Sequence, residues 1–373
     1  MDILYFLSLE NPVTAQWQKY HIVNELQMHD CYITIFTPIA GQSIKQTNER
    51  LIRYVKTHRV DLFMTIHNEH LVYTETIQEI GQQGIPTLLI CFDNLVIPYQ
   101  HKNIASYFDL VWLTSRETEG MFRSWGANTI FQPYAANPQM WNPYFGDDVS
   151  RIVFLGSPYG SRVNMINHLL RHGIPVTLYA GSSATRNGES KVNPIVRKTL
   201  QDYIGMAKAL FRDLQFSIGR RVVYGAILQK TIKRQRLLVD SLNLIREPSI
   251  SPDRQGEVYS KYAMALSSTA ARCTGVLKKP VDIVNLRSFE IPMSGGLQFC
   301  RYTDELAEYF ENQKEIVFYE SDDEMLELAQ YYLGSEHTDL RLQIKKAARK
   351  RAEGEHTWYI RFRNIFNVLG IHV

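Results

Sequence analysis

Residues 151–172, RIVFLGSPYGSRVNMINHLLRH, decide the fold of this 373-residue chain. They begin with an apolar, β-branched run typical of a strand, pass through a turn that contains two glycines, and end in a helical pattern. A second strand-like run follows at residues 176–179. Because a strand, a helix and another strand in succession form a unit of parallel sheet, this stretch predicts that an α/β domain begins near residue 150.

The first half of the chain shows the same alternation. Amphipathic patterns, including those of residues 15–28 and 48–58, separate short apolar or β-branched runs. Strands that alternate with helices predict a parallel sheet covered on both faces. The runs expected to form strands are residues 3–7, 32–37, 62–66, 87–92, 110–113 and 129–131.

A run rich in proline and asparagine, around residues 133–148, separates the two halves and is typical of an exposed linker. We therefore expect one Rossmann-like domain in residues 1–145 and a second in residues 150–355. In the second half, further strands are expected at residues 259–268, 297–299 and 316–319, and helices at residues 305–310, 323–333, 339–353 and 358–369.

The composition is that of a soluble globular protein, with 45% hydrophobic and 21% charged residues. No apolar run approaches the length of a membrane span, and the first residues lack the basic start of a signal peptide. The four cysteines are scattered, which favours reduced thiols and a cytoplasmic location. A net charge of only +3 argues against a dedicated nucleic-acid binder.

The positive charge is concentrated in a segment expected to be helical, at about residues 193–245. Residues 194–239 contain ten Lys or Arg against two Asp, a net charge of +8, so the rest of the chain carries −5. We expect a basic helical insert within the second domain. It could contact an anionic membrane surface or a polyanionic acceptor, or its charges could simply be solvated.

The turn after the strand at residue 151 is the first candidate site. Gly156 and Ser157 open it, and Arg162 begins the next helix with a guanidinium suited to phosphate. The glycine spacing is not that of a dinucleotide fingerprint, and no Gly-Lys-Ser/Thr follows. An ordinary strand-to-helix turn with a surface arginine is the alternative.

The second candidate is NLRSFEIPMSGG, residues 285–296. Arg287 and Glu290 share one helical face, with Ser294 a further turn along. Glu290 would accept the hydroxyls of a ribose, and Gly295 and Gly296 would leave room for a ligand and offer backbone amides. The alternative is a solvated salt bridge on a helix surface.

In the first domain, His67 and Asp93 each follow a predicted strand and are candidates for catalytic contacts with sugar or acceptor. The two histidines His67 and His70, beside a carboxylate, suggest a metal site, but no clear third ligand accompanies them, and neither HExxH nor DxD is present. We therefore expect no metal site and no bound cofactor.

Several runs resemble the CgeB-like, spore-maturation-type glycosyltransferases. They include RIVFLGSPYGSR, VYSKYAMALSSTAARCTGVLKKP, NLRSFEIPMSGGLQF, YTDELAEYF and EHTW in the second half, and CFDNL and FDLVWLTSRET in the first. The resemblance implies a GT-B fold, which consists of two facing Rossmann-like domains. It also implies that the second domain binds the donor and that residues 356–373 form a helix crossing back to the first, acceptor-side domain. Related retaining enzymes carry two acidic residues eight apart, which here correspond to Asp282 and Glu290.

The sequence therefore predicts a metal-independent, retaining glycosyltransferase with a nucleotide diphosphate-sugar donor. The acceptor would be a glycan, a lipid-linked compound or a protein hydroxyl, and the enzyme would be cytoplasmic, with possible contact of the insert with anionic membrane. A sugar-nucleotide epimerase and a non-catalytic binding or assembly protein on the same fold are the alternatives. A NAD-dependent oxidoreductase is disfavoured because neither half contains GxGxxG.

Overall fold

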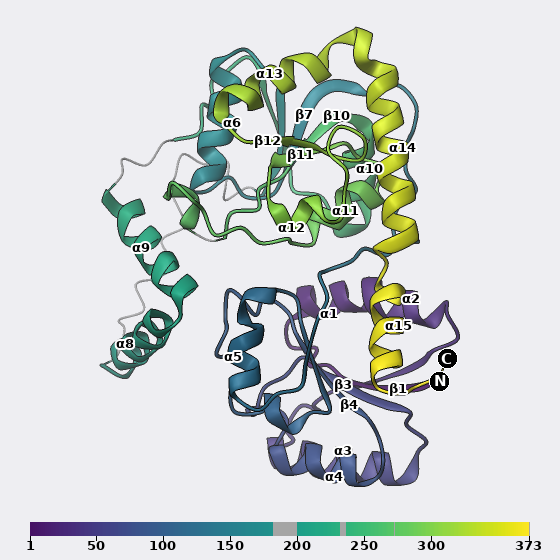
Figure 1. Cartoon of the computed structure of the whole chain (residues 1–373). Coiled ribbons are helices and arrows are strands. Elements are labelled where there is room, and N and C mark those ends of the chain that lie inside the picture. Colours follow the sequence, from purple (N-terminus) through teal and green to yellow (C-terminus); the bar gives the residue numbers. More distant parts are fainter. Residues whose placement is uncertain (182–199, 232–235, 272, 373) are drawn as a thin grey trace. The chain divides into compact units, whose positions relative to one another are not determined.

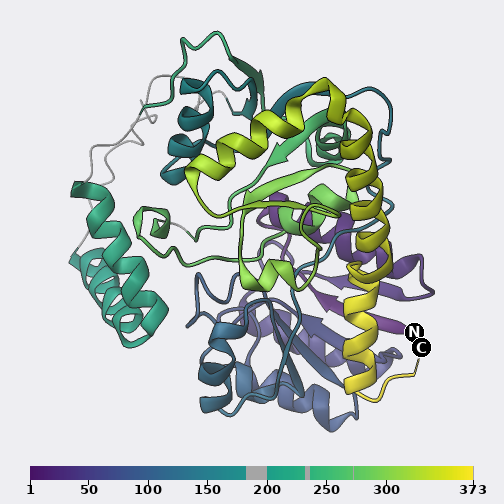
Figure 2. The same cartoon turned by 45° about the horizontal axis from the view of Figure 1, so that its top comes forward.

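A computed structural model describes residues 1–181, 200–231, 236–271 and 273–372. The chain divides into two compact units, the first made of Met1–Met140 with Glu355–Val373 and the second of Trp141–Gly354. Each unit is built on its own six-stranded parallel sheet (Figures 1 and 2). No helix in the described part of the chain is both long enough and apolar enough to cross a membrane.

The sheet of the first unit has the strand order β2-β1-β3-β4-β5-β6. Its inner strands are buried on both faces, which explains why they occur in the sequence as continuous apolar runs. All six predicted strands are confirmed, and no boundary differs by more than one residue. They are β1 (Asp2–Phe6), β2 (Tyr32–Phe36), β3 (Leu62–Thr65), β4 (Thr87–Cys91), β5 (Leu110–Leu113) and β6 (Thr129–Phe131).

Helices α1 (Pro12–Gln18), α2 (Asn24–Gln27), α3 (Ile44–Thr57), α4 (Thr74–Gln82), α5 (Glu119–Ser124) and α15 (Trp358–Val368) complete the first unit. Between α1 and α2 the chain forms a π-helical turn, η1 (Lys19–Val23), so the predicted helix 15–28 consists of three segments. Glu25 fixes the start of α15, because its carboxylate accepts the backbone N–H of Trp358 (3.1 Å) and of Tyr359 (3.0 Å). Burial raises the pKa of Glu25 to about 7, and these hydrogen bonds oppose the rise.

The sheet of the second unit has the order β12-β11-β10-β7-β8-β9. Its strands are β7 (Val149–Leu155), β8 (Val176–Ala180), β9 (Leu244–Pro248), β10 (Tyr262–Leu266), β11 (Gln298–Arg301) and β12 (Val317–Tyr319). The helices are α6 (Ser161–Arg171), α8 (Leu200–Gln215), α9 (Ser217–Thr231), α10 (Pro252–Lys261), α11 (Arg287–Met293), α12 (Asp304–Ala307), α13 (Asp322–Leu333) and α14 (Thr338–Glu355).

The two faces of this sheet carry different helices, because successive side chains of a strand point to opposite sides. Ile152 and Phe154 of β7 belong to the core that contains α6 and α13. Val153 and Leu155 belong to the core that contains α10 and α11. The carboxyl edge of the sheet therefore lies between the starts of helices from both layers.

Two predictions in this unit need correction. The expected strand 259–268 is shorter, because α10 continues to Lys261 and β10 begins at Tyr262. Strand β9, LIREP, falls in and just after the region expected to be the insert. It was missed because it is an edge strand, half exposed and without an apolar run. Within the expected insert, residues 200–231 form α8 and α9, whereas residues 236–243 contain no helix; residues 193–199 and 232–235 lie outside the described residues.

A buried ion-pair network holds α14 against the start of β7. Asp148 accepts hydrogen bonds from Arg341 Nη2 (2.7 Å) and Lys345 Nζ (3.2 Å), and all three side chains are less than a tenth exposed. Burial alone would raise the pKa of Asp148, but the two cations hold it below its ordinary value. Breaking such a network leaves an uncompensated buried charge, so it fixes the position of α14 strongly.

Candidate functional site

The turn after β7 brings Gly156 against the guanidinium of Arg287, the first residue of α11. Gly156 has a φ of +126°, which L side chains rarely adopt. A Cβ atom added at Gly156 would lie 3.2 Å from Arg287 Nη2. The glycine therefore permits a close approach between two segments that are far apart in the sequence, and both had been predicted to bind the donor.

Arg162, in the first turn of α6, belongs to the same cluster. Its guanidinium lies over the ring of Tyr159, 4.4 Å from the centroid, and its Nη1 donates to the carbonyl oxygen of Ser157 at 3.4 Å. Burial lowers the pKa of Arg162, and the positive charge of Arg287 lowers it further. Two neighbouring guanidinium groups repel each other, so an anion bound beside them would be stabilised by both.

Arg287 has unused hydrogen-bonding capacity. Its Nε is buried and has no hydrogen-bond partner among the described residues. The phenol of Tyr259 on α10 lies beside the same guanidinium. A buried polar group without a partner costs about 1–3 kcal/mol. A ligand with acceptor oxygens would remove this cost, and phosphate is such a ligand.

Glu290 lies one turn along α11 from Arg287 and is only 8% exposed. Its neighbours Phe289 and Ile291 are completely buried, so the alternative of a solvated surface salt bridge is wrong. Burial raises the pKa of Glu290 to about 7, although the charge of Arg287 opposes this. A carboxylate in such surroundings gains from hydroxyl donors, because they replace the water that burial removed.

The carboxyl end of α11 does not have the role that the sequence indicated. The hydroxyl of Ser294 is buried and donates to the carbonyl oxygen of Glu290. The amides of Gly295 and Gly296 donate to the carbonyls of Pro292 and Ile291, which is the Schellman ending of a helix.

The space beside these glycines is also filled. A Cβ atom at Gly295 would lie 2.7 Å from Pro143 and one at Gly296 would lie 3.0 Å from Ile291. The expectation that Ser294, Gly295 and Gly296 face a ligand is therefore wrong, since their polar groups and their free space are already used within the fold.

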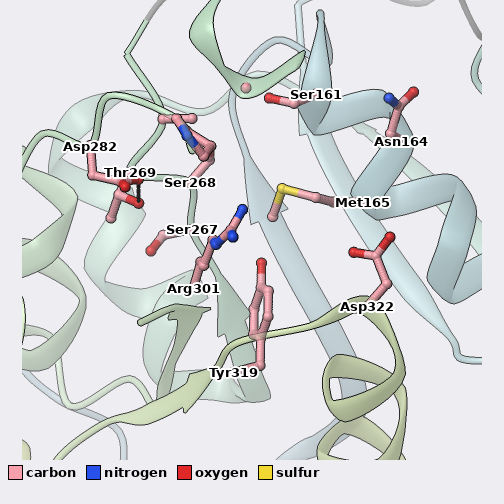
Figure 3. A pocket seen from close by; sticks show the side chains of 13 residues that line it. Ser161, Asn164, Met165, Ser267, Ser268, Thr269, Asp282, Arg301, Tyr319 and Asp322 are labelled. Carbon is pink, nitrogen blue, oxygen red and sulfur yellow. Dashed lines mark hydrogen bonds between the residues drawn. The ribbon is translucent and has the colours of Figure 1, made fainter. Parts of the chain in front are cut away.

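A cavity of about 240 Å³ lies at the carboxyl ends of β10, β11 and β12, beside the first turns of α6 and α13 (Figure 3). Figure 3 shows Arg301 from β11 and Tyr319 from β12 pointing into the same space. Hydroxyl and charged side chains line most of it, including Ser161, Ser267, Thr269, Asp282, Arg301 and Asp322. A small ligand with several hydroxyl groups would find both donors and acceptors here.

Asp282, eight residues before Glu290, lines this cavity. Its Oδ1 accepts a hydrogen bond from Thr269 Oγ1 at 2.7 Å (Figure 3). Burial raises the pKa of Asp282, against the effect of the Thr269 hydroxyl and of the positive charge of Arg301. The two acidic positions of the resemblance thus lie at different places, Asp282 in the cavity and Glu290 in α11.

His67 and Asp93 lie in the first unit, at the ends of the adjacent strands β3 and β4. Nε2 of His67 accepts the backbone N–H of Ser8 at 2.8 Å, so the proton of the neutral ring is on Nδ1. Burial and the nearby His101 lower the pKa of His67 to about 4. Asp93 is exposed, and its Oδ1 accepts a hydrogen bond from the hydroxyl of Tyr134 at 3.1 Å. His67 can therefore serve a ligand as a donor through Nδ1, and Asp93 can serve as an acceptor.

The sequence reasoning missed Arg301, Tyr319 and Asn164, which line the cavity. Tyr319 ends a predicted strand, and Arg301 lies two residues beyond the predicted strand 297–299, so the rule that ligands bind at carboxyl ends of parallel strands could have included both. Among the described residues, no three or more His, Cys, Asp or Glu side chains are grouped to hold a metal ion.

Known proteins share features of this sequence and this architecture. Residues 206–367 match the model of a family described as glycosyl transferase-like. No curated protein matches the chain.

Three solved structures are similar over 99% of this chain. Sucrose-phosphate synthase from Thermosynechococcus elongatus has a TM-score of 0.55 and 12% identity, and 99% of that chain is covered. HepE from Anabaena, in complex with UDP, has a TM-score of 0.55 and 13% identity, and 100% of that chain is covered. A glycosyltransferase from Rickettsia africae ESF-5 has a TM-score of 0.54 and 12% identity, and 97% of that chain is covered. The fold is therefore GT-B, and the family match and the fold agree on glycosyl transfer as the class of activity.

Proposed function

We propose that this chain is a CgeB-like glycosyltransferase that moves a sugar from a nucleoside diphosphate-sugar to an acceptor hydroxyl, with retention of configuration and without a metal ion or cofactor. The observation that carries the proposal is the meeting of Arg162, Arg287 and the Gly156 turn beside the buried Glu290. Two guanidinium groups and a half-neutralised carboxylate at one sheet edge match the diphosphate and the ribose of such a donor.

The two arginines would hold the diphosphate and stabilise the charge that develops on it as the glycosidic bond breaks. Fixed donors aimed at a leaving group are worth more in a site with little water than in solution. Arg287 is suited to this role because its Nε is buried without a partner among the described residues. The backbone of Gly156 and Ser157 would lie against the same phosphates.

Glu290 would accept the ribose hydroxyls as a carboxylate. The cavity with Asp282 and Arg301 would then receive the sugar to be transferred, whose hydroxyls match its lining. In the first unit, His67 would donate to, and Asp93 accept from, the reacting sugar or the acceptor. A glycan, a lipid-linked compound and a protein hydroxyl remain the acceptor classes, and the reaction would take place in the cytoplasm.

A panel of nucleoside diphosphates and their sugars, read by thermal shift, tests the donor site. We expect one nucleotide series to stabilise the wild type and to lose most of its effect on Glu290→Ala. Glu257→Ala is the matched control, because Glu257 is an exposed carboxylate on α10 paired with Lys261. If no nucleotide stabilises the wild type, or if Glu290→Ala responds as the control does, the donor site is wrongly placed.

Product analysis separates the proposal from its alternatives. Transfer to an added acceptor supports it. A nucleotide-sugar converted to its epimer would identify an epimerase, and binding without turnover over a broad acceptor panel would identify a binding protein on the same fold.

A further inference from the structure

The helical pair α8–α9 of the second unit exposes large apolar side chains that the proposed chemistry does not use. On α8 these are Leu210 (47% exposed), Phe211 (67%) and Leu214 (41%), and on α9 they are Tyr224 (59%) and Ile227 (58%). Figures 1 and 2 show the pair lying outside the α/β layers of its unit. Clustered exposed apolar side chains on a water-soluble surface indicate a contact with something else.

The apolar residues of α8 occupy one side of the helix and have basic residues next to them. Since each residue turns the helix by about 100°, Leu210, Phe211 and Leu214 fall within an arc of about 100°. Lys208 and Arg212 are one turn apart and lie next to Phe211 around the helix, and both are exposed. This is the pattern of a helix that lies in a membrane interface, with apolar side chains below and cations at the level of the headgroups.

Helix α9 repeats the pattern on one face and is anchored by the other. Arg220, Tyr224 and Ile227 fall within an arc of about 60°. On a different face, Gly225 approaches the backbone of Cys273 so closely that a Cβ would lie 2.9 Å from its carbonyl oxygen. The exposed face of α9 is therefore the one left over after the helix has packed on its own unit.

The contacts that attach α9 to its unit include a residue that lines the cavity. Arg221 of α9 donates hydrogen bonds to the carbonyls of Lys279 and Pro280, and Pro280 lines the cavity. The Sγ of Cys273 also donates to the carbonyl of Val222 on α9. The pair is thus held to the wall of the candidate site by several contacts, so a surface that binds it would lie at a defined place relative to that site.

We propose that α8–α9 docks this protein on the surface of an anionic lipid bilayer. Charge complementarity favours this partner, because residues 200–231, which contain the two helices, have five Lys or Arg against two Asp, a net charge of +3, and so carry the whole net charge of the chain. The apolar residues add burial at the acyl boundary, and no helix in the described part of the chain is suited to span the membrane. The docking does not depend on the proposed glycosyl transfer and can fail or succeed separately from it.

Co-sedimentation of the full chain with vesicles tests the proposal. We expect binding to vesicles of phosphatidylcholine with phosphatidylglycerol, and little binding to phosphatidylcholine alone. Phe211→Asp should weaken binding about tenfold or more, since it removes an aromatic side chain that the bilayer would bury and adds a negative charge. Lys208→Glu should weaken it about fivefold or more, and high salt should act in the same direction.

Met28→Asp is the matched control, because Met28 of the first unit is 60% exposed, close to the 67% of Phe211. A second measurement does not rely on weakened binding. Phe211→Trp should show tryptophan fluorescence that brominated lipids quench, above the level seen for wild type and for Met28→Trp. The proposal is overturned if wild type stays unbound to anionic vesicles, if Phe211→Asp binds as Met28→Asp does, or if Trp at 211 is not quenched on bound vesicles.

Discussion

Replacing Glu290 with glutamine should stabilise the ligand-free protein and at the same time weaken nucleotide binding. The buried carboxyl has a pKa of about 7, against 4.5 as its ordinary value. The folded state therefore binds the proton more tightly than the unfolded state, so ionisation of Glu290 destabilises the fold as pH rises from about 4.5 to about 7. A difference of about 2.5 pKa units corresponds to roughly 3 kcal/mol at pH 8.

Glutamine resembles the neutral carboxyl, so Glu290→Gln should recover roughly this free energy at pH 8. For a unit of this size, 1 kcal/mol shifts the melting temperature by about 2–4 °C, which gives a gain on the order of 6–12 °C. At pH 5 the gain should fall below about 1 kcal/mol, because the folded carboxyl is then still protonated and pH 5 lies only about half a unit above its ordinary pKa of 4.5. Binding of the nucleoside diphosphate that stabilises the wild type should weaken about tenfold or more, since hydrogen bonds from ribose hydroxyls to a charged acceptor are lost.

Thermal unfolding at pH 5 and pH 8, together with calorimetric titration of that nucleoside diphosphate at pH 8, measures both effects. Glu257→Gln serves as the control for stability, because that carboxylate is exposed. A structural salt bridge to Arg287 makes the opposite prediction for stability. If Glu290→Gln unfolds at a lower temperature than wild type at pH 8 and binds the nucleotide equally well, the carboxylate holds the fold and does not serve a ligand.

Three further changes test other parts of the structure. Gly156→Ala should weaken nucleotide binding about tenfold or more in the same titration, because a Cβ there crowds the guanidinium beside the turn and the φ of +126° is strained for alanine. Asp148→Asn should lower the free energy of unfolding in urea by about 3–5 kcal/mol, because Arg341 remains buried without its counter-charge, whereas the exposed neighbour Asp147→Asn should change it little. Glu25→Ala should lower the protection of the α15 amides in hydrogen exchange by about 1–2 kcal/mol, since two N–H groups lose their acceptor.

The strands could be predicted because most are buried between two helical layers. Strands such as β4 and β5 have every side chain buried, so the sequence shows short apolar runs with clear ends. Strand β9 pairs only with β8 at the edge of its sheet, and its Arg246 and Glu247 do not form such a run. Its place depends on pairing with β8, which composition does not reveal.

In the candidate site, the turn between a strand and a helix predicted binding residues, whereas the glycines at the end of a helix did not. Gly156 and Arg162 were predicted because they follow a strand and begin a helix, and ligands bind at that edge of a parallel sheet. Arg287 was predicted from its spacing to Glu290 on one helical face. The pair Gly295-Gly296 permits either a ligand or a Schellman ending, and both use a glycine with positive φ. What decided between them was the packing of Pro143 beside Gly295, a contact between distant segments.

The charged residues of the site also explain why the sequence pattern of a core helix does not hold at their positions. Glu290 is ionised only at a cost, and Arg287 keeps a buried donor without a partner among the described residues. A sequence chosen only for stability would place apolar side chains at such positions, as it does at Phe289 and Ile291 on the same helix. Helix α11 therefore departs from the pattern of a core helix at Arg287, which lies against the Gly156 turn, and at Glu290, one turn further along. Such a departure is expected where binding and not folding determines the residue, which is why the stability and the affinity of Glu290→Gln should change in opposite directions.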